Sequence, residues 1–250
     1  MNLLNARDTV LLADTPLRGA LDPILAARVV VEINQRARRI SVRVDPSRSC
    51  VVLVYPRRAP QRTVAAFVAS RADWIAKHLD ALPSRVSFSD GAVIPYVGID
   101  HVIRLRPEAR GGVWREDGQI IVAGRAEHGA RRVRDWLKSE ARTALTARVY
   151  AMAARIDVKV AQVGVRDTVS RWGSCSTKGK LSFSWRLIFA PEDVLTYVAA
   201  HEVAHLKHMD HSRAFWRTVM RILEEEKAAV NWTLARQWLR RGGTALHRYG

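Results

Sequence analysis

Two histidines and a glutamate in the C-terminal part of the sequence have the spacing of a metal site. His201 and His205 enclose Glu202 in the pattern His-Glu-x-x-His. Residues four apart on an α-helix lie one turn above each other on the same face, so both imidazoles can reach one metal ion. Glu202 neighbours the first histidine and can accept a proton from a water molecule held in the site. The pattern therefore predicts a catalytic zinc centre with Glu202 as general base.

A catalytic zinc usually keeps three protein ligands and one open position, so a third ligand is needed. His208 shares the helical face, but it would lie about 10 Å along the axis from His201, whereas zinc–nitrogen bonds are about 2.1 Å. His211 can reach the site if the helix ends near Lys207–Asp210 and the chain turns back. Its spacing is that of the long metzincin motif, in which Gly occupies the place of His208. We therefore expect His211 as the third ligand without a metzincin fold.

Two further residues are candidates for contact with the substrate or the transition state. Arg171 lies in a polar segment with a glycine, where it could stabilise a developing oxyanion or bind a phosphate; a structural role is equally open. Tyr197 lies one turn before His201 and either lines the site or fills the core, and the core is the favoured interpretation.

With these residues included, the chain resembles the YgjP-like group of zincin metallopeptidases, which is related to the WLM and SprT-like proteases. The resemblance rests on four segments, Arg171–Ser176, Leu181–Pro191, Tyr197–Glu202 and His211–Trp216, with weaker matches at Phe88–Gly91 and around Trp74. It implies zinc bound by His201, His205 and His211, with Glu202 as the catalytic carboxylate. Some members of the group are linked to hydrolysis of nucleotide phosphates.

The composition is that of a globular protein with an unusual charge. The chain has 250 residues, of which 48% are hydrophobic and 26% charged, and it has no apolar run long enough for a membrane helix. Its N-terminal stretch is a poor signal peptide, and two cysteines suit a reducing compartment, so we expect a cytoplasmic protein with no membrane partner.

The net charge of +17 has two interpretations. A basic surface attracts phosphate-rich partners, so a nucleic acid or nucleotide is a candidate partner. The alternative is a solvated arginine-rich surface without a specific partner. No DNA- or RNA-binding motif is visible, and the charge is spread along the chain, so the sequence favours neither interpretation.

The order of elements predicts an α+β fold with a β-rich N-terminal half, residues 1–125, followed by a small zincin-like catalytic domain with an HExxH helix, residues 126–250. In the first half we expect short strands between 29 and 122 and one helix over 61–82. In the second we expect helices over 130–156, 214–223 and 230–239 and strands over 158–169 and 181–189. The resemblance favours an edge position for the strand 181–189, where it could pair with an extended peptide; an interior strand is the alternative.

The leading functional hypothesis is a zinc-dependent metallopeptidase that acts on peptide or protein substrates. The second is a metal-dependent nucleoside triphosphate pyrophosphatase or phosphohydrolase, although the sequence lacks a P-loop. The third is a nucleic-acid-binding module with a structural zinc, for which Cys175 or His208 would supply a fourth ligand.

Overall fold

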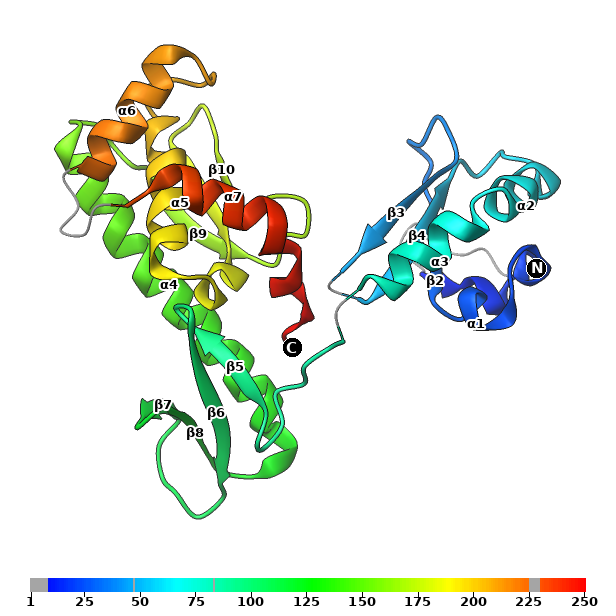
Figure 1. The fold of residues 1–250 in the computed structure, drawn as a ribbon, viewed down its shortest axis with the longest axis horizontal. Coiled ribbons are helices and arrows are strands. Elements are labelled where there is room, and N and C mark those ends of the chain that lie inside the picture. The colour runs from blue at the N-terminus through cyan, green and yellow to red at the C-terminus, as the bar shows by residue number, and fades with distance from the viewer. Residues whose placement is uncertain (1–8, 47, 83, 225–229) are drawn as a thin grey trace. The chain divides into compact units, whose positions relative to one another are not determined.

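The chain folds into two compact units, residues 1–85 and 86–250. The computed structural model, shown in Figure 1, describes residues 9–46, 48–82, 84–224 and 230–250. This boundary differs from the expected one at 125/126. Strands that we assigned to the N-terminal half pack instead on the long helix that follows them, and Ile103 and Ile120 share a core with Val133 and Leu137. Burial of these apolar side chains joins the strands to the second unit.

In its described residues, the first unit has a four-stranded sheet and three α-helices. The strand order is β1-β2-β4-β3, with β2 and β4 parallel and the other pairs antiparallel. The strands are Val10–Leu11 (β1), Val29–Ile33 (β2), Ser41–Asp45 (β3) and Cys50–Tyr55 (β4), and the helices are Pro23–Ala26 (α1), Gln61–Ala69 (α2) and Ala72–Asp80 (α3). The single helix expected over 61–82 is broken because the Ser70 hydroxyl donates to the carbonyl of Phe67 at 2.8 Å and competes with the helical pattern.

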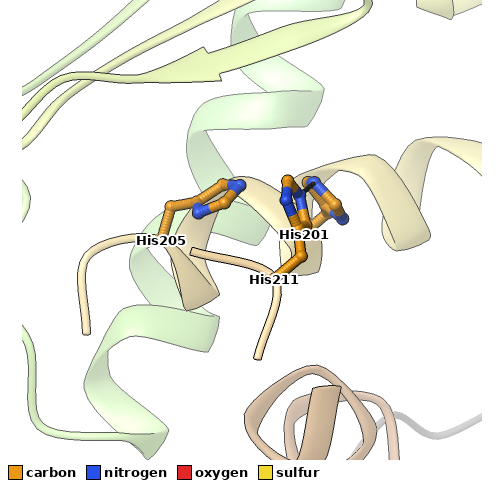
Figure 2. A group of neighbouring side chains, drawn as sticks. All are labelled: His201, His205 and His211. Carbon is orange, nitrogen blue, oxygen red and sulfur yellow. Dashed lines mark hydrogen bonds between the residues drawn. The ribbon is translucent and has the colours of Figure 1, made fainter. Parts of the chain in front are cut away.

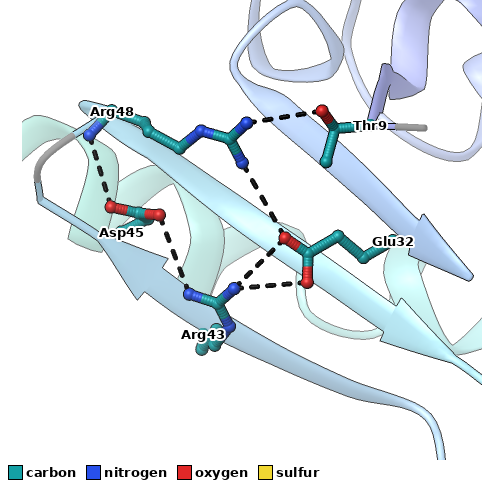
Figure 3. A network of polar contacts seen from close by, with 5 residues as sticks. All are labelled: Thr9, Glu32, Arg43, Asp45 and Arg48. Carbon is teal, nitrogen blue, oxygen red and sulfur yellow. Dashed lines mark hydrogen bonds and ion pairs between the residues drawn. The ribbon is translucent and has the colours of Figure 1, made fainter. Parts of the chain in front are cut away.

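A network of polar side chains lies on this first sheet (Figure 3). Arg43 pairs with Glu32 at 3.3 Å and with Asp45 at 3.8 Å, and Arg48 pairs with Glu32 at 3.8 Å and donates to the Thr9 hydroxyl. Both arginines are about half exposed, and ion pairs formed by such exposed side chains stabilise a fold only slightly. The network does show that two arginines of this basic chain have acidic partners within their own unit.

The second unit begins with another four-stranded sheet and the long helix α4. Its order is β5-β6-β8-β7, in which β6 and β8 are parallel. The elements are Val93–Tyr96 (β5), Ile99–Arg106 (β6), Val113–Glu116 (β7), Gln119–Ala123 (β8) and Gly129–Arg155 (α4). Short strands were expected throughout residues 29–122, but residues 86–88 form only one bridge, between Val86 and Tyr249. The buried residues of α4 repeat at helical spacing. They pack on this sheet, although we expected the sheet and the helix in different domains.

The rest of the second unit packs a three-stranded sheet and three helices against α4. These elements are Gln162–Arg166 (β9), Gly173–Cys175 (β10), Lys180–Ser184 (β11), Glu192–Ala204 (α5), Arg213–Glu224 (α6) and Trp232–Gly242 (α7). The overall class is thus α+β, with strands predominating early and helices after residue 129. Within the described part of the chain, no helix has the length and apolar character needed to cross a bilayer.

The strand expected over 181–189 differs from the structure in two ways. Only Lys180–Ser184 is extended, and Trp185–Phe189 forms a buried 3-10 helix. A short apolar run does not distinguish a buried strand from a buried helical turn, which explains the error. The sheet order is β10-β11-β9, so this strand is central and not an edge. The edge strand that contacts α5 is β10.

Candidate metal centre

Helix α5 carries the first histidine and the glutamate, and its burial fixes their positions. Ten of its residues are buried, which makes it a core helix apolar on nearly all sides. The helix ends at Ala204, a few residues earlier than expected, and His205 is its C-cap. The amides of Lys207 and His208 both donate to the carbonyl of Ala204, which closes a tight turn. This turn directs the following segment back toward His201.

Three imidazoles converge at the end of this helix (Figure 2). One ligand-capable atom from each of His201, His205 and His211 lies within 4.8 Å of the other two. Nε2 of His211 and Nε2 of His201 are 3.1 Å apart. Nitrogens bound at about 2.1 Å to one tetrahedral ion lie about 3.4 Å apart. The triad is therefore close to the arrangement that a shared cation requires. His208 is not part of this cluster.

The Phe215 ring of α6 supports all three imidazoles. Its centroid lies 4.9 Å from that of His201, 4.5 Å from His205 and 4.8 Å from His211. Phe215 is fully buried, so it cannot move without disturbing the core. The sequence motif gives the spacing of the histidines, but this aromatic side chain holds their rings in position.

The environment keeps His201 and His205 neutral, because it lowers the pKa of both side chains. Burial and then the neighbouring His205 and His211 lower the pKa of His201 to about 3. Burial also lowers the pKa of His205, against the effect of its Nδ1, which lies 3.0 Å from the carbonyl oxygen of His208. If Nδ1 carries the proton and donates to this carbonyl, Nε2 keeps a free lone pair. Neutral imidazoles with free lone pairs are the form in which histidine binds a metal ion.

Glu202 is buried beside the triad and protonates near neutrality. It is 6% exposed, and burial raises its pKa from 4.5 to about 7, although the positive charge of Arg171 lowers it. A carboxyl group with such a pKa can both accept and donate a proton at pH 7. Gly173 of β10 lies directly against it, because a Cβ at that position would be 2.5 Å from Oε1 of Glu202.

The edge strand β10 presents unpaired backbone groups beside this carboxylate. Gly173, Ser174 and Cys175 are in antiparallel register with Phe183, Ser182 and Leu181 of β11. The backbone carbonyl of Trp172 accepts from the amide of Ser184, and the backbone amide of Ser176 donates to the carbonyl of Lys180. Because the direction of hydrogen bonding alternates along an antiparallel ladder, the amides and carbonyls of Gly173 and Cys175 face away from β11.

The other predicted site residues lie close to this cluster. Arg171 is exposed, and its charge acts on Glu202. Tyr197 is 5% exposed, with its ring centroid 5.9 Å from that of His201, so it both fills the core and borders the site. Cys175 is no nucleophile at neutral pH, because burial and the nearby Glu202 raise its pKa to about 11.

Sequence reasoning missed two residues of this site. Gly173 is the glycine in the polar segment of Arg171 and has no predicted role of its own, whereas its missing side chain leaves space for Glu202. Arg236 of α7 was not considered, yet its guanidinium lies over the Trp216 ring, 5.2 Å from the centroid, and its charge lowers the pKa of His201. Neither residue has a local sequence signal, because each reaches the site from an element distant along the chain.

Comparisons with known proteins assign the family of this chain. A family model described as the YgjP-like metallopeptidase domain matches residues 38–241, and the chain therefore belongs to the YgjP-like family. This assignment confirms the resemblance and makes the protein a member of a metallopeptidase family. One similar solved structure is the metallopeptidase zymogen of Pyrococcus abyssi abylysin, at 20% identity and a TM-score of 0.33 over 39% of this chain and 94% of that one. No curated protein was found to match.

Proposed function

We propose that this protein is a zinc-dependent metallopeptidase with His201, His205 and His211 as metal ligands and Glu202 as general base. The observation that carries the proposal is the convergence of three imidazoles beside one buried carboxylate. Three nitrogen ligands with a neighbouring acid are typical of a catalytic zinc, which keeps a position open for water or substrate.

The donor set fits zinc and argues against a closed structural site. Structural zinc ions usually have four Cys or His ligands. Among the residues that the structure describes, the cluster holds three histidines, and neither His208 nor Cys175 completes it. Imidazole nitrogens suit zinc, whereas magnesium and calcium prefer oxygen ligands.

The chain's own residues supply the proton transfers. A zinc ion held by the triad would polarise the substrate carbonyl and lower the pKa of a coordinated water. Glu202 accepts the proton of the attacking water and passes it to the leaving amine. Its pKa of about 7 suits both steps, since the same group must act first as a base and then as an acid.

The free edge of β10 is the proposed site for the substrate backbone. An extended peptide can add as a further strand there, with hydrogen bonds to the outward-facing groups of Gly173 and Cys175. Because Gly173 lies against Glu202, a substrate peptide bond that pairs with Gly173 is next to the proposed base. This role replaces the one that we expected for the strand 181–189.

Three residues are candidates for stabilising the negative charge that develops on the substrate carbonyl. Arg171 and Arg236 carry positive charge close enough to act on Glu202 and His201, respectively. Tyr197 borders His201, but burial raises the pKa of its hydroxyl, which keeps it a neutral donor. Hydrogen-bond donors and cations aimed at a developing oxyanion are a large part of catalysis in acyl transfer.

The test compares wild type with Glu202→Gln for zinc content and hydrolysis. Both proteins are given unfolded casein, with and without DNA, and a panel of nucleoside triphosphates. We expect equal zinc in the two proteins and casein cleavage by wild type alone. Casein cleavage by Glu202→Gln at the wild-type rate would refute the role of Glu202. Turnover of nucleotides but not casein would replace the peptidase with a phosphohydrolase.

The ligand assignment needs a separate measurement. His211→Ala should lose most of its bound zinc, because two protein ligands remain, whereas His208→Ala should keep it. Unchanged zinc content in His211→Ala would show that the third ligand is another residue.

A further inference from the structure

A hollow next to His205 has no role in the chemistry described so far. Its volume is about 570 Å³. Three segments line it: residues 159–161 before β9, the turn 176–179 between β10 and β11, and residues 205, 206 and 209 after α5. Since His205 is a proposed metal ligand, a group bound in the hollow lies next to the scissile bond. The turn continues directly from β10, so a peptide paired with that strand extends toward the hollow.

Backbone hydrogen bonds hold the turn in position. The amide of Gly179 donates to the carbonyl of Ser176 at 2.9 Å, and the amide of Ala161 donates to the carbonyl of Gly179 at 2.9 Å. The Ser176 hydroxyl accepts from the Lys180 amide at 3.1 Å. Gly179 has a φ of +69°, a conformation that glycine adopts without strain. The hollow is therefore formed before any ligand binds, which lowers the entropic cost of binding.

The charged side chains of the hollow are all positive. Lys159 and Lys178 line it, and none of the acidic residues that the structure describes does. Within the described residues, neither lysine forms an ion pair or a side-chain hydrogen bond. Other cationic side chains of the unit have acidic partners within it, for example Arg148, which pairs with Glu192 at 2.7 Å. Two unpaired ammonium groups around one hollow favour a negatively charged ligand.

The remaining lining is largely apolar. Val160, Ala161, Leu206 and Met209 contribute aliphatic and thioether surface, and Met209 is 53% exposed. An exposed methionine is an adaptable contact for an apolar ligand group. A ligand that matches this lining has a short aliphatic stem and a negatively charged end, which describes the side chain of an acidic amino acid.

We infer that this hollow is a specificity subsite, in which Lys159 and Lys178 select an acidic side chain close to the scissile peptide bond. The inference deepens the proposed peptidase function and rests on it. It assigns the substrate class as peptides with Glu or Asp beside the cleaved bond.

The test uses the full chain loaded with zinc and a mixture of unfolded proteins, with the cleaved bonds identified by mass spectrometry. Matched peptides that carry Glu, Gln or Lys at the selected position then give kcat/KM values. We expect the Glu peptide to exceed the Gln peptide by about tenfold, the size of two exposed ion pairs. Lys159→Glu with Lys178→Glu should reverse the order and favour the Lys peptide. Lys159→Met with Lys178→Met should abolish the preference for Glu over Gln.

Lys138→Glu is the matched control, since Lys138 lies on α4 outside this hollow and carries the same charge. It should keep the preference for Glu, which excludes an effect of net charge alone. Cleavage without preference for acidic residues, or a preference that the lysine variants leave unchanged, overturns the inference while the peptidase function stands. Failure of wild type to cleave any peptide overturns the proposed function, and this subsite with it.

Discussion

Gly173 and Glu202 are in direct contact, although they lie on an edge strand and a core helix. A Cβ at Gly173 would be 2.5 Å from Oε1 of Glu202 and 2.6 Å from its Cγ, which is closer than real contacts allow. The edge strand thus approaches the carboxylate as closely as a backbone can. This contact brings the proposed peptide-binding edge and the proposed base within reach of the same substrate bond.

The first prediction follows from this contact. Gly173→Ala should displace the Glu202 carboxylate and lower kcat by about 100-fold, the scale of a misplaced catalytic group. Zinc content should stay at the wild-type level, because the histidines are not involved. Gly164→Ala is the control, since a Cβ there meets only the carbonyl oxygen of Leu181 at 4.0 Å. Full activity in Gly173→Ala would show that Glu202 does not depend on this approach.

Phe215 should control metal affinity through packing. We expect Phe215→Leu to weaken zinc binding about tenfold and to lower the free energy of unfolding by about 1–2 kcal/mol, because the ring that holds all three imidazoles is removed. Val219→Ala, on the same helix and equally buried, should lower stability without changing zinc affinity. Competition titration with a chelator and thermal melts separate the two effects. Equal zinc affinity in Phe215→Leu and wild type would contradict the prediction.

Arg236 should affect metal binding and turnover in opposite directions. Its charge lies beside Trp216, whose ring centroid is 5.9 Å from that of His201, so it repels a cation in the triad. Arg236→Met should therefore bind zinc about threefold more tightly and yet turn over substrate more slowly, because a cation near the developing negative charge is lost. Arg217→Met, exposed on α6, is the control. If Arg236→Met bound zinc more tightly and kept the wild-type kcat, Arg236 would have no role in turnover.

Glu202 should make the metal-free protein less stable as the pH rises. Its carboxyl is harder to ionise in the folded state, where burial raises the pKa from 4.5 to about 7. The resulting loss of folding free energy is absent below pH 4.5 and increases up to pH 7. Above pH 7 it is complete, at about 3 kcal/mol. His201 has the opposite trend below pH 6.5, because burial lowers its pKa to about 3. Wild type and Glu202→Gln share that trend, so the difference between their free energies of unfolding isolates the effect of Glu202.

Urea unfolding of chelator-treated wild type and Glu202→Gln across pH 4–9 measures this difference. We expect Glu202→Gln to be the more stable protein at pH 8, with an advantage that shrinks toward pH 4.5. A difference that does not change with pH would show that Glu202 has no raised pKa in the folded protein.

The unit boundary at residue 85/86 predicts how the chain can be divided. A fragment of residues 86–250 should fold and bind zinc, because it contains the complete core shared by β5–β8 and α4. A fragment of residues 126–250 should aggregate, since Val133 and Leu137 lose the strands that bury them. Circular dichroism and zinc titration of both fragments check this. A folded 126–250 fragment would restore the boundary first expected from the sequence.

Much of the proposed catalytic segment was determined by local sequence. The spacing of His201, Glu202 and His205 requires only one helical turn, and the apolar stripe of α4 repeats with the period of a helix. Such periodic signals depend on neighbours a few residues away, which is why they are readable without a structure. The α+β class and the family followed from the same local patterns.

The remaining features depend on contacts between segments far apart in the sequence. The order β10-β11-β9, which makes β10 the edge, results from strand pairing that the apolar pattern of residues 181–189 does not encode. Gly173 reaches Glu202, and Phe215 reaches His201, only after the sheet and α6 have packed on α5. The raised pKa of Glu202 follows from the same packing, because burial is a property of the assembled core. The sequence by itself determined which groups are available for chemistry, and the tertiary structure decided their neighbours, since packing brings together residues that no local pattern relates.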